Sequence, residues 1–114
     1  MLKIIDGLCA ALLLMGAALH AFGSVLSYPG GSELLVWALS GSLAAALVAA
    51  MNLLRLFRPG DTAITVLALV SAVLWALVAA AFGHSIHAYL DVRVVWHFVA
   101  ALALAGFSIW ALLQ

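Results

Sequence analysis

Residues 62–87 read TAITVLALVSAVLWALVAAAFGHSIH, and this run contains no aspartate, glutamate, lysine or arginine. A helix needs about 20 predominantly apolar residues to cross the hydrocarbon core of a bilayer. Three similar runs fill most of the remaining chain. Of the whole chain, 69% is hydrophobic and only 7% is charged. Average soluble domains contain about 25% charged residues. The sequence therefore predicts an all-α integral membrane protein with four transmembrane helices.

Turn-forming residues separate the apolar runs. SYPGG occupies 27–31 and RPGD occupies 58–61, and proline and paired glycines interrupt helices. Because the connections are only a few residues long, successive helices should be antiparallel neighbours in an up-down-up-down bundle. We expect one domain over 1–114, with helices over about 2–25, 32–57, 62–87 and 92–113.

Polar residues at the helix starts agree with these boundaries. The second run is preceded by Ser32 and the fourth by Asp91, and the third begins at either Asp61 or Thr62. Serine, threonine and aspartate are preferred N-caps, because their side-chain oxygens accept hydrogen bonds from the first free N–H groups of a helix. The second, third and fourth predicted spans therefore each begin at a residue suited to cap a helix.

Basic residues in short loops predict the orientation, since lysine and arginine accumulate on the cytoplasmic side. Lys3, Arg55 and Arg58 lie on the side of the N-terminus, and only Arg93 lies on the other. We therefore expect a multi-pass protein of the inner (plasma) membrane with both termini in the cytoplasm.

All four histidines are predicted to lie near the outer face. His20 is about five residues from the end of its helix and His97 about six from the start of its helix, which places both at a similar depth. His84 and His87 end the third run, and Glu33 begins the second. Ionisable groups inside a membrane usually face the bundle interior and often mark function. We expect His20, His84 and His97 to bind a cofactor, with His87 and Glu33 completing a wider metal-ligand set.

The expected cofactor is a transition metal or haem b, because imidazole suits zinc, copper, iron and nickel. A haem needs only two axial imidazoles, from a His20–His97 or a His20–His84 pair. Two alternatives stay open: histidines that bind no ligand and only reach the interface or form hydrogen bonds, and proton-linked transport. No spacing matches a signature such as HExxH or CxxCH.

Function is predicted only at the level of class. One hypothesis is a membrane protein that uses its histidine site for redox chemistry or metal handling; the alternative is a non-catalytic transporter or channel protomer, or an accessory subunit. The expected partners are the lipid bilayer and either further copies of the chain or a larger membrane complex. Zero net charge and the lack of a basic run argue against nucleic acid. Whether the protein is an enzyme is left open.

Overall fold

The computed structural model describes all 114 residues and consists of four helices joined by short turns. The prediction of an all-helical protein is confirmed. The helices are α1 (Leu2–Ser27), α2 (Glu33–Phe57), α3 (Thr62–Ser85) and α4 (Val92–Leu112).

Helix α3 ends two residues earlier than expected, at Ser85. His87 there has a φ of 53°, in the left-handed region that terminates helices. The N–H of Ala88 bonds back to the carbonyl of Gly83 at 3.0 Å. The chain thus turns out of the helix with its last carbonyls partly satisfied.

Side-chain caps begin three of the helices. The Ser32 hydroxyl accepts a hydrogen bond from the N–H of Leu35, and the Asp61 carboxylate accepts one from the N–H of Ile64. Asp91 accepts one from the N–H of Arg93 at 2.9 Å. Asp61, rather than Thr62, is therefore the cap of α3.

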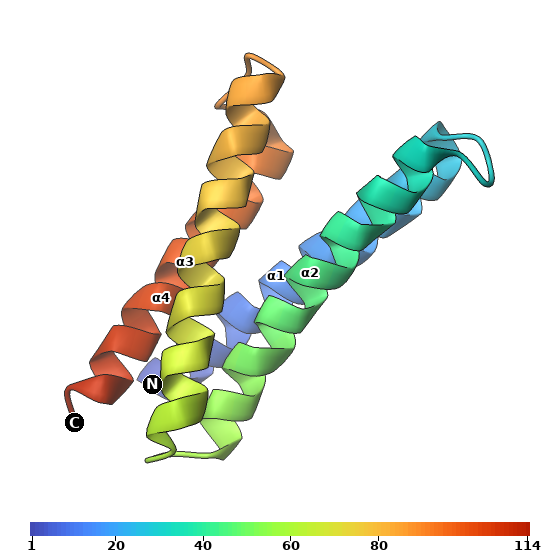
Figure 1. Cartoon of the computed structure of the whole chain (residues 1–114). Helices are drawn as coiled ribbons and strands as arrows, with labels where there is room; N and C mark the ends of the chain where they lie inside the picture. Colours follow the sequence, from blue (N-terminus) through green and yellow to red (C-terminus); the bar gives the residue numbers. More distant parts are fainter.

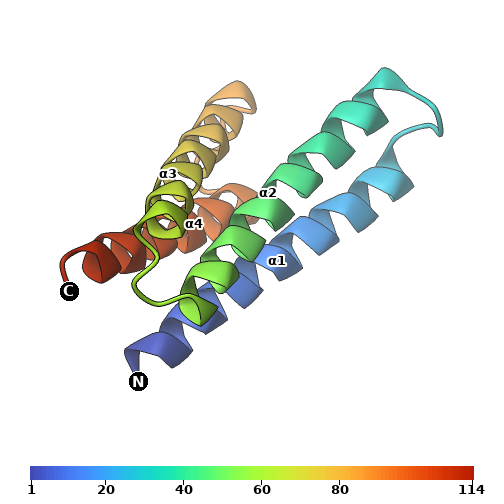
Figure 2. The ribbon, with the colours of Figure 1, turned by 60° about the horizontal axis from the view of Figure 1, so that its bottom comes forward.

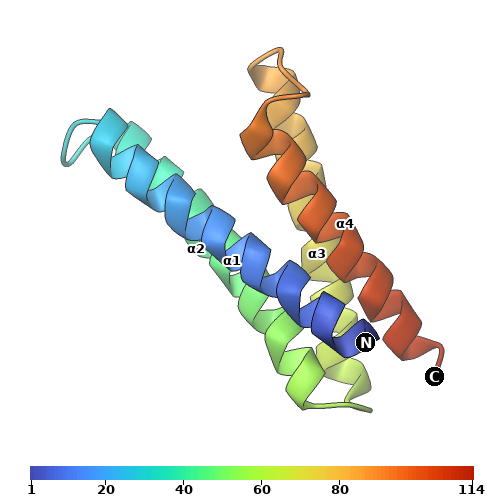
Figure 3. The same cartoon turned by 180° about the vertical axis from the view of Figure 1, so that it is seen from behind.

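The helices form two hairpins, α1 with α2 and α3 with α4 (Figure 1). Both termini and the turn at 58–61 lie at one end of the molecule, here called the terminal end. The hairpins diverge toward the opposite end, which carries the turns at 28–32 and 86–91 and is here called the open end (Figures 1 and 3). Figure 2 shows the same two pairs of helices from another direction. Each helix packs most extensively against its partner in the same hairpin.

The core consists mostly of small side chains. Fully buried alanines include Ala10, Ala49, Ala72 and Ala101, and Leu13 and Leu104 are the large apolar residues among them. In lipid, burying large apolar groups gains little, and small residues allow close contact between helices. Large leucine, valine and phenylalanine side chains instead cover the outside. All four helices are long and apolar enough to span a membrane, which indicates a multi-pass membrane protein.

Candidate functional site at the open end

Two adjoining cavities lie between the hairpins toward the open end, with volumes of about 340 and 330 Å³. They share five lining residues, contributed by α1, the turn after it, α3 and α4: His20, Tyr28, Phe82, Arg93 and His97. We call the two cavities together the open-end cleft. Two of the four histidines thus reach the same cleft from the first and last helices.

His97 is held against α1 by a close approach of two helices. A Cβ added at Gly16 would lie 3.1 Å from Nε2 of His97 and 3.0 Å from the indole of Trp96. The Trp96 indole N–H donates to the carbonyl of Leu12 at 2.9 Å. A methyl group at position 16 would crowd both rings, so glycine there favours the close α1–α4 contact.

A hydrogen bond from α3 fixes the protonation of His97. The Trp75 indole N–H, which can only donate, lies 3.2 Å from Nδ1 of His97. Nδ1 is therefore the unprotonated acceptor, and the proton of the neutral ring lies on Nε2. Metal-ligating histidines show the opposite pattern, in which the nitrogen away from the metal donates its proton. The Trp75–His97 contact therefore disfavours a metal bond at His97 in this arrangement.

His20 is half-buried in α1, one helical turn beyond Gly16. Its side chain lines both cavities of the cleft. The Ser24 hydroxyl donates to the His20 backbone carbonyl at 2.7 Å, so this serine is satisfied within its own helix. The His20 imidazole is consequently the polar group that α1 presents to the cleft.

His84 and His87 lie apart from this cleft, at the exposed end of α3. Nδ1 of His84 is 2.7 Å from the hydroxyl of Tyr89, and the rings of His84 and His87 are 6.2 Å apart. Glu33 is also exposed, and accepts a hydrogen bond from the indole of Trp37 in its own helix. The structure therefore places His20 and His97 in one cleft. His84 and His87 lie near each other at a separate, exposed place.

The chain contains no group of three or more histidine, cysteine, aspartate or glutamate side chains that could hold a metal ion. An ion held by protein ligands alone usually needs three or four of them. The five-residue ligand set expected from the sequence has no support in this arrangement. A pair of axial ligands is a smaller requirement, and for His20 and His97 it stays a prediction.

The charged residues at the rim of the cleft neutralise each other. Arg93 bonds the carboxylate of Asp91 through Nε and Nη2, at 2.9 and 2.8 Å. These hydrogen bonds hold the pKa of Asp91 at about 2, well below its ordinary value. Asp91 is therefore ionised at any physiological pH, and Arg93 already has an anionic partner.

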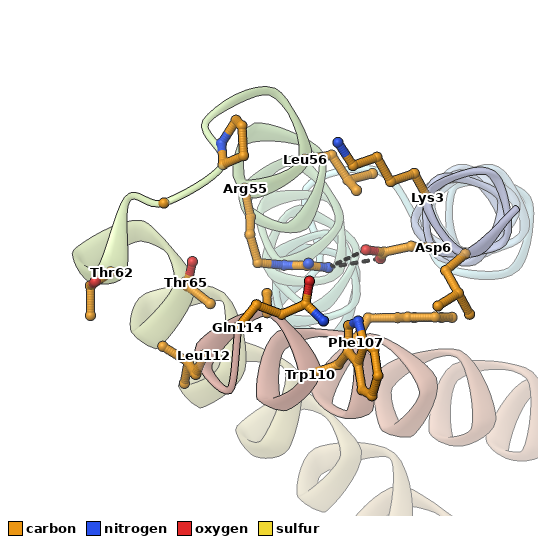
Figure 4. A pocket seen from close by; sticks show the side chains of 14 residues that line it. Lys3, Asp6, Arg55, Leu56, Thr62, Thr65, Phe107, Trp110, Leu112 and Gln114 are labelled. Carbon is orange, nitrogen blue, oxygen red and sulfur yellow. Dashed lines mark hydrogen bonds and ion pairs between the residues drawn. The ribbon is translucent and has the colours of Figure 1, made fainter.

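The terminal end contains a buried polar network that is not predicted from the sequence, and Figure 4 shows its ion pair between Asp6 and Arg55. Nη2 of Arg55 lies 2.7 and 2.9 Å from the two carboxylate oxygens of Asp6, and each residue is 5% exposed or less. The Asn52 carbonyl oxygen accepts from the same nitrogen at 3.4 Å and from the Ser108 hydroxyl at 3.3 Å. The network thus connects α1, α2 and α4.

A signal for this network was present in the sequence. Asp6 lies one turn inside the start of the first helix, and Arg55 lies just before the end of the second. In a tight hairpin these two positions meet at the same depth with opposite charge. The bias of basic residues uses Arg55 only as a marker of orientation, whereas the cost of burying an arginine in a membrane predicts that it has a partner.

Comparison with protein-family models, characterised proteins and solved structures finds no match to this chain.

Proposed function

We propose that the chain is a multi-pass protein of the inner (plasma) membrane that holds haem b in the open-end cleft, with His20 and His97 as axial ligands. The observation that carries the proposal is that these two imidazoles line the same cleft although they come from the first and last helices. Helical bundles commonly build cofactor sites from inward side chains of facing helices.

The proposed orientation has four crossings in up-down-up-down order, with both termini in the cytoplasm. Lys3, Arg55 and Arg58 would then lie on the cytoplasmic side, in agreement with the bias of basic residues toward that side. The open-end cleft would lie toward the outer face.

Haem fits the available ligands better than a bare metal ion. A porphyrin supplies four nitrogens to its iron, so the protein needs to supply only the axial ligands. Two imidazoles are available at this cleft, and no group of three or more ligating side chains exists elsewhere in the chain. The number of available ligands is therefore our reason for proposing haem b instead of another transition-metal cofactor.

The size and lining of the cleft also support a flat, mostly apolar ligand. Its two cavities, of about 340 and 330 Å³, are each within the usual range of about 300–1,000 Å³ for small-molecule sites. Phe82 lines both of them, and Trp75 and Trp37 line one. These aromatic side chains would keep water away from the ring of the ligand.

The proposed activity is electron transfer. Haem supplies one-electron redox chemistry when it is bound. His20 and His97 would hold the haem, and their two imidazoles would be the ligands that the protein supplies. Arg93, already paired with Asp91 at 2.8 Å, would contribute little charge to the site.

A second function is favoured by the hydrogen bond from Trp75 to His97. In this alternative the imidazoles join helices and bind no cofactor, and the chain is a non-catalytic accessory subunit or a small transporter or channel protomer. Haem binding requires His97 to give up the Trp75 bond, because a ligated ring carries its proton on the nitrogen that faces Trp75. The two functions therefore predict opposite effects of removing that indole.

The test is reconstitution of the purified chain with haem, read by the Soret band and by a reduced-minus-oxidised spectrum. If the haem proposal is right, wild type binds with a stoichiometry near one, and His20→Ala and His97→Ala abolish binding. His84→Ala is the matched control, because it removes an exposed imidazole that does not line the cleft. No Soret band from wild type, or equal binding by His20→Ala and His84→Ala, would refute the proposal.

Trp75→Phe separates the two functions. It keeps an aromatic ring but removes the N–H donor. In the haem-binding protein this change leaves haem affinity unchanged or raises it. In the accessory subunit no haem is bound, and the change only lowers the melting temperature, as His97→Ala does.

A further inference from the structure

A cavity of about 490 Å³ lies at the terminal end, away from the open-end cleft. Residues of all four helices and of the turn at 58–61 line it. Figure 4 shows Arg55 of α2, Asp6 and Lys3 of α1, and Trp110 of α4 around this space. We call it the terminal-end cavity.

The guanidinium of Arg55 in this cavity is only partly used. All of its hydrogen bonds within the chain pass through one nitrogen, Nη2, which contacts Asp6 and Asn52. Nε is buried and has no partner. An unmade hydrogen bond at a buried donor is costly, and more so when the donor is charged. The ion pair with Asp6 therefore leaves Nη1 of Arg55 without a hydrogen-bond partner, so its N–H groups are free for a further acceptor.

The other lining groups favour an anion as that acceptor. Of the charged side chains in the cavity, Lys3 and Arg55 are cationic and only Asp6 is anionic. Asp6 already has both oxygens on Arg55. The lining also contains the indole N–H of Trp110 and the hydroxyl of Thr62, which can donate further hydrogen bonds.

We propose that the terminal-end cavity binds a phosphate group, held by the free N–H groups of Arg55 and by the ammonium of Lys3. A guanidinium N–H group forms a charge-assisted hydrogen bond to a phosphate oxygen, and lysine contributes as a point charge. The phosphate can come from the headgroup of an anionic lipid or from solution. The apolar side chains of Leu2, Phe107 and Leu112 in the same lining suit the glycerol and acyl part of a lipid.

The experiment uses the full chain, purified in detergent and freed of lipid. Native mass spectrometry measures binding of phosphatidylglycerol and of phosphatidylcholine with the same acyl chains. A melting-temperature titration with inorganic phosphate, against chloride at equal ionic strength, measures the soluble source. Phosphatidylglycerol preference alone identifies the lipid headgroup, and a phosphate-dependent rise in melting temperature identifies free phosphate. If neither appears, the proposal is wrong.

Lys3→Gln tests the site without disturbing the buried ion pair, because Lys3 is exposed. We expect it to weaken binding of the anionic ligand about fivefold, the usual effect of one basic residue near anionic headgroups. Arg58→Gln is the matched control: Arg58 is an exposed cation at the same end that does not line the cavity. Equal losses in both variants would show general charge attraction and overturn the proposal.

Asp6→Asn gives a second, opposite test. It preserves the shape of the side chain and removes the charge that compensates Arg55, so the cation should attract phosphate more strongly. We expect tighter binding of the same ligand. Weaker or unchanged binding by a folded Asp6→Asn protein would contradict the role of Arg55. Lys3→Gln decides the matter if this variant fails to fold.

Discussion

The two ends of the molecule differ in how their polar side chains are used. At the terminal end, Arg55 joins Asp6 and Asn52 in a buried network, and Ser108 extends that network to α4. At the open end the hairpins diverge (Figure 3), and one hydrogen bond, from Trp75 to His97, connects side chains of α3 and α4 beside the cleft. The terminal end therefore stabilises the helix arrangement, and the open end has room for a ligand.

The largest predicted effect comes from breaking the ion pair at the terminal end. Asp6→Ala leaves the Arg55 cation buried and without its partner, which typically costs about 3–5 kcal/mol of unfolding free energy. Unfolding in mixed detergent, followed by circular dichroism, measures the loss. The double variant Asp6→Leu with Arg55→Leu should recover most of it, because no unpaired charge remains. His20→Ala provides the comparison at the open end, where the loss should be much smaller. Equal losses at the two ends would contradict the division of roles.

The second prediction concerns the contact that closes one side of the open-end cleft. Gly16→Ala places a methyl group 3.0 Å from the Trp96 indole and 3.1 Å from the His97 ring. Crowding of this kind costs about 1–3 kcal/mol, and it should move His97 away from α1. Gly23→Ala is the matched control in the same helix, since nothing lies within 4 Å of its added Cβ. It should be neutral or stabilising by up to about 1 kcal/mol, as alanine favours helix.

Melting temperatures of the two glycine variants give the comparison, and haem binding gives a second readout. Equal melting temperatures and equal haem binding of Gly16→Ala and Gly23→Ala would show that moving α1 away from α4 has no free-energy cost. The α1–α4 contact would then not close this side of the cleft.

The third prediction measures how much the network gains from crossing between helices. Ser108→Ala removes the hydroxyl that bonds Asn52 in α2 at 3.3 Å. Hydrogen bonds between membrane helices average about 0.6 kcal/mol, and we expect a loss of that order. Ser71→Ala is the control, because the Ser71 hydroxyl bonds only to the carbonyl of Ala68 in its own helix. A double-mutant cycle with Asn52→Ala isolates the pairwise contribution. A loss for Ser71→Ala as large as that for Ser108→Ala would argue against cross-helix bonding as the cause.

The sequence was sufficient to predict the helices, since each is an apolar run that ends at a turn or begins at a capping residue such as Ser32 or Asp91. It was less informative about the site. Counting residues along a helix gives depth, and depth places His20, His84 and His97 at a similar level. It does not give the angle between hairpins, which depends on contacts such as Gly16 against Trp96. His84 therefore shares the expected level with His97 but lies exposed beside Tyr89.

The smallest predicted effect is at the rim of the open end. The Asp91–Arg93 pair lies at the start of α4, and its only contact with another helix is the Arg93 guanidinium over the exposed edge of α3, 5.4 Å from the centroid of the Phe82 ring. The pKa of Asp91 is about 2, below its ordinary value of 3.8. A carboxylate with a lowered pKa stabilises the fold fully above the ordinary value, and this contribution disappears as the pH falls through the folded-state value. Asp91→Asn should therefore lower the melting temperature slightly and equally between about pH 8 and 5, because asparagine also caps helices and exposed ion pairs contribute little.

The gap between wild type and Asp91→Asn should then close as the pH approaches 2, where the wild-type carboxylate becomes protonated. Melting temperatures of both proteins across this range check the prediction. A gap that changes between pH 8 and 5 would require a group that titrates there, and histidine is the side chain that ordinarily changes its charge in this range. Such a result would mean that Asp91 and Arg93 are energetically coupled to the imidazoles. The open end would then contain a connected polar network, as the terminal end does, and the contrast between the two ends would fail.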